Sequence, residues 1–260
     1  MIARWWQALQ QRREARTLEQ RAIPEALWAL TLARFPFLSK RSAEDVQRLR
    51  EIATLFLARK EFTGTADAPV TDEMAVAIAA QACLPVLQLG LRWYDGFVGI
   101  VVHPDAVQVR RSHTDDIGVV HEYDDELSGE AMEGGPVMLS WSDVAEAGES
   151  AEWGYNVVIH EFAHVLDMRD GMANGMPPLA SRAEREHWAH TLQAHYDAFC
   201  QQVDAEEETL LDPYGAEAPD EFFAVASETF FVAPLALRDE LPALYDLLAG
   251  FYRQDPAATA

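Results

Sequence analysis

The sequence predicts an α+β fold that is mostly helical and contains a small mixed β-sheet. Helical periodicity occurs near both ends of the chain, in residues 3–20, 24–33 and 43–59 and again in 154–169, 181–203, 218–232 and 237–253. Between these regions, short runs rich in Val, Ile and aromatic residues are typical of strands, at 97–102, 118–123 and 136–141. Helices, then clustered strands, then helices describe an α+β domain rather than a βαβ series.

Two helix starts carry recognisable capping residues. Ser42 is a suitable N-cap for the helix at 43–59, and Thr71 followed by Glu73 begins another helix that we expect to reach about Trp93. Pro85 lies inside that stretch and should kink or divide it. No internal repeat or Gly/Ser-rich linker separates two halves. We therefore expect one compact unit, with residues 1–70 as a helical layer packed on a body of residues 71–260.

The charge of the chain is large and unevenly distributed. Its formal net charge is -23, yet residues 1–60 hold 12 Lys and Arg against 6 Asp and Glu, whereas residues 61–260 hold 8 against 37. Such an acidic body would repel a phosphate backbone, so we expect no direct nucleic-acid partner. The acidity either serves solubility alone or attracts basic peptides or a basic protein partner.

Other features of the sequence favour a cytoplasmic location. The N-terminal residues lack the apolar core and cleavage site of a secretory signal, and no apolar stretch reaches the roughly 18 residues that suggest a membrane span. Cys83 and Cys200 have no metal-binding or redox spacing, which suits free thiols in a reducing compartment.

The strongest chemical motif is His160-Glu161-Phe162-Ala163-His164. Histidines four residues apart stand about 40° apart around a helix, so both imidazoles face one point and can bind one Zn²⁺. Glu161 is rotated by about 100° from His160 and stands where the general base for an attacking water belongs. The alternative is two histidines that share a helix face by chance. The motif favours a zinc peptidase with a zincin-like domain.

A catalytic zinc ion needs a third protein ligand, and spacing leaves several candidates. Asp170 matches the last ligand of the longer motif H-E-x-x-H-x-x-G-x-x-H, but Asp167 replaces the glycine that turns the chain there. Asp167 is either a partner for the far N–H of a ligand histidine or a solvated carboxylate. Glu221 and Glu228 share one face of a later helix, and spacing does not choose between them or exclude two surface glutamates.

Separate sequence blocks occur in the same order as in a known family. They are residues 84–91, Asp95-Gly96-Phe97, Asp116-Ile117-Gly118, Gly135-Pro136-Val137, 160–167 and 251–256. The chain thereby resembles the Mlc titration factor A family, peptidase family M90, over almost its whole length. These are bacterial zinc peptidases that also bind the glucose repressor Mlc.

The resemblance implies a set of site residues. The family's zinc glutamate is the first Glu of an E-x-F-A-V segment, which falls on Glu221. His160, His164 and Glu221 would then be the ligands of one Zn²⁺, and Glu161 the base. The family, like the similar catalytic domain of anthrax lethal factor, has a tyrosine seven residues before that glutamate. It falls on Tyr214, whose phenol would donate to an oxyanion; without the resemblance, a turn tyrosine that packs its ring is the commoner interpretation.

The resemblance also implies aminopeptidase-like activity, so a peptide substrate and the repressor Mlc are the expected partners. The alternative function is a regulatory protein-binding module that sequesters a repressor, with catalysis incidental. An intact Glu161 favours chemistry, because a purely structural zinc site has no use for a base. Residues 134–141 precede the motif and form either an exposed edge strand that binds substrate backbone or an ordinary interior strand.

Overall fold

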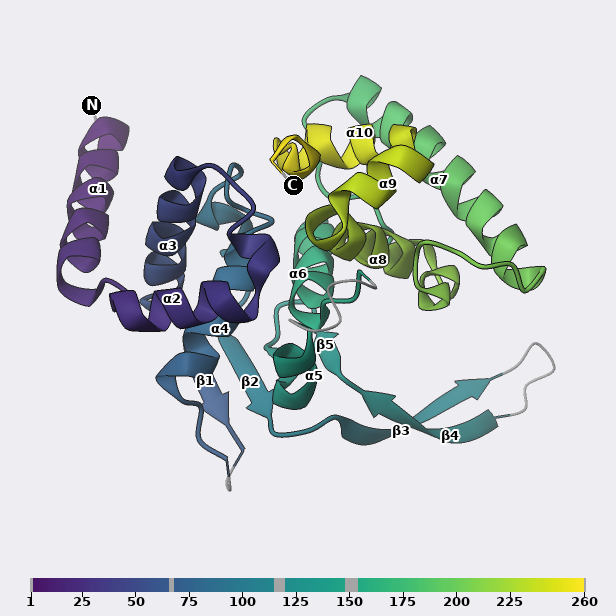
Figure 1. Ribbon diagram of the computed structural model, residues 1–260, viewed down its shortest axis with the longest axis horizontal. Helices are drawn as coiled ribbons and strands as arrows, with labels where there is room; N and C mark the ends of the chain where they lie inside the picture. The colour runs from purple at the N-terminus through teal and green to yellow at the C-terminus, as the bar shows by residue number, and fades with distance from the viewer. Residues whose placement is uncertain (1, 66–67, 115–119, 148–153, 260) are drawn as a thin grey trace.

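Helix α6 (Val157–Asp167) lies between helices from the two ends of the chain in the computed structural model (Figure 1). The structure describes residues 2–65, 68–114, 120–147 and 154–259. The N-terminal helices are α1 (Ile2–Arg21), α2 (Glu25–Arg34), α3 (Ala43–Leu57) and α4 (Asp72–Cys83). The C-terminal helices are α7 (Arg182–Asp204), α8 (Pro219–Val232), α9 (Pro234–Glu240) and α10 (Pro242–Tyr252).

A small mixed sheet accompanies these helices, and the predicted α+β class is confirmed. Its strands stand in the order β1 (Glu61–Gly64), β2 (Gly99–His103), β6 (Val137–Ser140) and β5 (Gly129–Ala131). The first three are parallel, whereas β5 pairs antiparallel with β6 and forms an edge. Short helix α5 (Trp141–Glu146) follows β6. Strands β3 (Val107–Thr114) and β4 (Val120–Leu127) form a separate antiparallel hairpin that extends away from the helices (Figure 1).

Ser42 and Thr71 cap helices α3 and α4 as predicted. Two helices are shorter than predicted, and in both cases a proline lies at the break. The Ser42 hydroxyl accepts from the N–H of Asp45, and the Thr71 hydroxyl accepts from Met74. Helix α4 ends at Cys83 rather than near Trp93, because Pro85 has no N–H to continue the helix. The stretch predicted as one helix at 237–253 is likewise divided, with α10 beginning at Pro242.

The strands predicted at 97–102 and 136–141 are confirmed as β2 and β6. Of the strand predicted at 118–123, residues 120–123 belong to β4, and residues 118 and 119 lie outside the described ranges. The edge-strand interpretation of residues 134–141 is wrong. Strand β6 is interior, because β2 pairs with one of its sides and β5 with the other. The edge belongs to β5, a three-residue strand with too little apolar alternation for the sequence to reveal it.

An aromatic cluster anchors α6 on the side of Phe162. The wholly buried Phe162 ring lies 5.0 to 5.8 Å, between ring centroids, from Phe56, Tyr94 and Phe97. Burial of such rings supplies both apolar area and edge-to-face contacts. Within the described ranges, no helix has the combination of length and apolar character that a bilayer crossing requires.

Candidate metal centre

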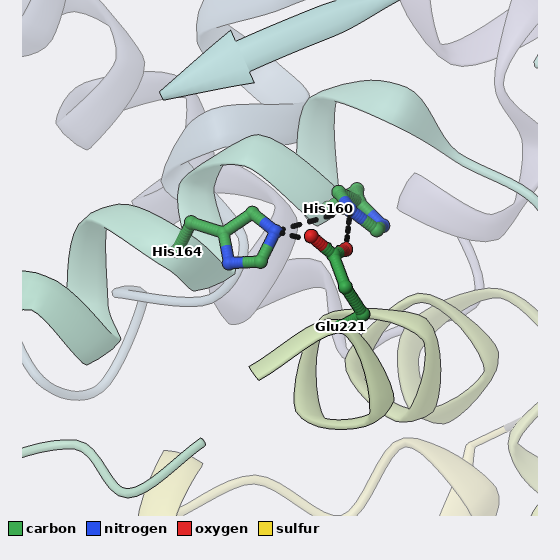
Figure 2. Close-up of side chains that lie close together, drawn as sticks. All are labelled: His160, His164 and Glu221. Atoms are coloured by element: carbon green, nitrogen blue, oxygen red, sulfur yellow. Dashed lines mark hydrogen bonds and ion pairs between the residues drawn. The ribbon is translucent and has the colours of Figure 1, made fainter. Parts of the chain in front are cut away.

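Asn156 sets the start of the helix that carries both histidines. Its side-chain oxygen accepts from the N–H of Ile159 at 2.9 Å, so the helix begins at Val157, three residues later than predicted. From this helix His160 and His164 project to the same side, and their Nε2 atoms lie 3.1 Å apart (Figure 2). The i, i+4 spacing therefore brings the two imidazoles together as the sequence predicts.

Helix α8 brings a carboxylate to the same point. Pro219 occupies its first position, where a missing N–H is harmless, and Glu221 follows in the first turn. The Glu221 Oε2 atom lies 3.0 Å from Nε2 of His160 and 3.3 Å from Nε2 of His164. Figure 2 shows this carboxylate pointing from one helix at the two imidazoles of the other.

The three donor atoms match the dimensions of a tetrahedral zinc site. Zinc bonds of about 2.0–2.1 Å place two ligand atoms of a tetrahedron roughly 3.3 Å apart. The donor atoms of His160, His164 and Glu221 lie 3.0, 3.1 and 3.3 Å apart in the structure. Two imidazole nitrogens with one carboxylate also form a ligand set that zinc enzymes use. The residues therefore fit a zinc ion, and they form a metal-capable group among the described residues.

Glu228 fixes the orientation of His160. Its Oε1 atom lies 2.7 Å from Nδ1 of His160, and its Oε2 accepts from the backbone N–H of Asn156. A proton on Nδ1 that is donated to Glu228 leaves the Nε2 lone pair directed at the metal position. Glu228 thus supports the ring from the side opposite Glu221, although both glutamates lie on the same face of α8.

Electrostatics within the cluster follow from burial and these hydrogen bonds. Burial acts to lower the pKa of His160, but the bonds from Glu221 and Glu228 outweigh it and raise that pKa well above its usual range. Burial acts to raise the pKa of Glu221, but its bonds to His160 and His164 outweigh it and hold that pKa well below its usual value. The contacts between these side chains therefore favour a positively charged His160 next to an ionised Glu221.

A buried amide pair links the site to α4. The Asn156 Nδ2 group donates to Oε1 of Gln81 at 2.7 Å, and the Gln81 amide donates to the carbonyl of Ala77 at 3.1 Å. Both amide side chains are completely buried, so these bonds replace the water that they lose. The position of Asn156, just before an apolar helix, is a sequence signal for a cap; Gln81 carries no comparable signal.

Glu161 lies in a cavity of about 190 Å³ with the two histidines, Tyr214 and Glu221. Burial raises the pKa of its carboxyl group. Strand β5 passes so close that a methyl group on Gly129 would lie 2.5 Å from Oε1 of Glu161. Only glycine leaves room for the carboxylate at this approach, and nothing in the sequence around Gly129 points to that role.

Tyr214 lines the same cavity from a short 3₁₀ turn, Pro213–Ala216. Asp212 caps this turn by accepting from the N–H of Tyr214 at 2.9 Å. The Tyr214 ring centroid lies 5.9 Å from that of His160, and the residue is 44% exposed. Tyr214 thus lines the cavity while part of the residue is exposed to solvent.

The described contacts of Asp167 differ from those expected for a histidine partner. Its Oδ2 atom accepts from the N–H groups of Asn174 and Gly175 at 2.8 and 2.7 Å. Gly175, at φ +74°, packs so tightly that a methyl group there would lie 2.4 Å from the carbonyl oxygen of Pro219. Asp167 therefore holds a loop against the start of α8. Asp170 is exposed at the end of the 3₁₀ turn after α6 and is not in the donor group.

The chain is similar to known proteins along most of its length. A sequence model described as "Glucose-regulated metallo-peptidase M90" matches residues 9–253. A protein of Yersinia pestis called Mlc titration factor A is 38% identical over 226 residues, which cover 86% of this chain and 83% of that protein. The protein of the same name in Yersinia pseudotuberculosis has the same identity and coverage. An uncharacterized protein of Synechocystis sp. is 39% identical over 240 residues, 92% of this chain and 87% of that protein.

We predict that Asp167 makes the metal-free protein less stable as the pH rises. Burial raises its pKa to about 6, against the opposing effect of its two amide donors, whereas the unfolded chain has a carboxyl pKa of about 3.9. The protonated Asp167 carboxyl group therefore contributes fully to the free energy of unfolding below about pH 4, and this contribution is lost as the pH rises through about 6. Between about pH 4 and 7, the free energy of unfolding should therefore fall by about 3 kcal/mol less in Asp167→Asn than in the wild type.

Urea denaturation at several pH values, with a chelator present, measures this difference. Asp170→Asn is the matched control, because it changes an exposed carboxylate three residues further along the chain. The same pH dependence in the wild type and Asp167→Asn would contradict the prediction.

Proposed function

The chain belongs to the glucose-regulated metallo-peptidase M90 family, and on that premise we propose that it is a zinc-dependent peptidase with aminopeptidase-like activity. His160, His164 and Glu221 would hold one catalytic Zn²⁺. The observation that carries the proposal is their set of donor atoms, 3.0 to 3.3 Å apart, in one cavity with the buried carboxyl group of Glu161.

The chain's own residues account for proton transfer and charge stabilisation in this mechanism. When bound, zinc supplies Lewis-acid chemistry that polarises a carbonyl and lowers the pKa of water. Glu161 takes the proton of the attacking water and then gives it to the leaving amine. Its raised pKa suits both roles. Tyr214 donates its phenolic proton in a hydrogen bond to the oxyanion that develops on the attacked carbonyl.

The substrate class follows from the walls of the cavity. Strand β5 has a free edge in the described sheet, and it can pair with the backbone of an extended peptide. Glu130 and Asp220 also line the cavity and would attract the positive α-amino group of a peptide, which favours aminopeptidase-like cleavage. Because α6, which carries both histidines and Glu161, packs against the antiparallel edge strand β5, we assign the domain a zincin-like fold.

A regulatory role in repressor binding is the second candidate function. The specific support is the name of two similar proteins, Mlc titration factor A. We propose that this chain also binds the repressor Mlc, and that binding and peptide hydrolysis are separate properties. A cytoplasmic location suits both roles and the two free thiols, Cys83 and Cys200.

We predict that Glu161→Gln keeps bound zinc but loses about 10²- to 10⁴-fold in kcat, because an amide cannot accept the proton. Glu221→Ala should lose most of the zinc as well as hydrolysis, because one of three ligands is gone. Zinc content by mass spectrometry and hydrolysis of a free-amine peptide measure both effects. Glu217→Ala is the matched control, because it changes an exposed glutamate four residues before Glu221 and outside α8.

Hydrolysis unchanged in Glu161→Gln would contradict the base assignment, and full zinc retention in Glu221→Ala would contradict the ligand assignment. The Glu161→Gln protein also separates the two functions. Calorimetric binding of purified Mlc should be the same for this variant and the wild type, whereas the absence of binding by both would refute the regulatory role.

We predict a different signature for Tyr214→Phe. The phenyl ring retains the packing against His160 but lacks the donor, so kcat should decrease by about 10²-fold with zinc content unchanged. Steady-state kinetics provide the measurement. A change confined to KM would show that the phenol binds substrate rather than the transition state.

A further inference from the structure

A second cavity, of about 450 Å³, adjoins the catalytic cavity. Met168 lines both, so the two cavities meet at this residue, which directly follows α6. Its apolar lining comes from Trp93, Phe97, Met132, Val165 and Met168. We call it the Met132 recess, after the residue that follows β5 and is 41% exposed.

Five apolar side chains line the recess together with three charged ones, so its exposed lining is polar and apolar in about equal parts. The Arg169 guanidinium, on its lining, lies 5.4 Å from the Trp93 ring centroid and donates to the carbonyls of Arg92 and Trp93 at 2.6 and 3.0 Å. That cation is thus tied to the wall. The two acidic side chains on the lining, Asp95 and Glu133, would repel a carboxylate. The recess therefore disfavours an acidic guest, and its five apolar side chains offer contact area to a large apolar one.

The direction of β5 determines which substrate residues lie beside the recess, those before or those after the cleaved bond. Gly129 stands against the Glu161 carboxylate, and the chain then leaves β5 at Ala131 and lines the recess with residues 132–134. An extended peptide that pairs antiparallel with β5 runs in the opposite direction. Its residues before the scissile bond then lie over residues 131–134, beside the recess.

We propose that the Met132 recess binds the side chain of the substrate residue on the amino side of the scissile bond, and that it selects a large apolar side chain there. For an aminopeptidase this is the first residue of the substrate. The assignment rests on the proposed peptidase function and names its specificity. Met132 and Met168 suit such a site, because unbranched, polarisable side chains adapt to guests of different shape.

A set of free-amine peptides that differ only before the cleaved bond tests the assignment in the zinc-loaded protein. Products are identified by mass spectrometry, so the position of cleavage is known. Leu or Phe at this position should give kcat/KM about 10- to 200-fold above Gly, and Asp should fall below Gly. A flat profile, or a preference that depends only on the residue after the cut, would overturn the assignment.

The substitution Met132→Glu tests whether the recess is the source of the preference. It places a carboxylate on an exposed wall residue, so the ratio of kcat/KM for Leu over Gly should decrease about 10-fold and Lys should become a better substrate. Met172→Glu is the matched control. It puts the same charge on a nearby, 58% exposed methionine outside the recess lining, and the wild-type ratios should persist.

The outcomes separate this assignment from the function on which it rests. Wild-type ratios in Met132→Glu, with hydrolysis intact, overturn the recess assignment alone. Absence of hydrolysis in the zinc-loaded wild type, or hydrolysis that persists in Glu161→Gln, overturns the proposed peptidase function and with it the role of the recess.

Discussion

Ionisable side chains packed between two helices in an apolar interior set the main constraint on this structure. His160, Glu161, His164 and Glu228 are all buried, and burial of a charged group costs several kcal/mol unless a partner compensates it. The partners are held within hydrogen-bond distance, with Glu228 behind His160 and Glu221 in front. A cation held by the three donor atoms would complete the compensation, which would give the charged cluster a physical reason to lie there.

The constraint explains why α6 and α8 are tied together at both ends. At the start of α6, the backbone N–H of Asn156 donates to Glu228 near the end of α8. At the end of α6, Asp167 holds Gly175, whose backbone packs on Pro219 at the start of α8. The helices thus lie antiparallel between two polar contacts. Glu221 needs no loop flexibility to reach the histidines, and a site held by rigid elements keeps its geometry.

The sequence predicts what depends on neighbours in the chain. Ser42, Thr71 and the pair His160 and His164 act within one or two helical turns, so capping rules and the i, i+4 spacing predict them. Glu221 and Glu228 share a helix face, and only the position of α6 decides which carboxylate meets Nε2 and which meets Nδ1. Resemblance to a family, not spacing, indicated Glu221. Gly129 depends on a close approach between distant segments, which no local pattern encodes.

The zinc site at His160, His164 and Glu221 is tested most directly by an anomalous difference map recorded at the zinc absorption edge, from crystals of the zinc-loaded protein. We expect the strongest peak at about 2.0–2.1 Å from Nε2 of both His160 and His164, in contact with the Glu221 carboxylate. Comparison with data collected below the edge identifies the metal. A strongest peak elsewhere, or no peak between these three side chains, would contradict this zinc site.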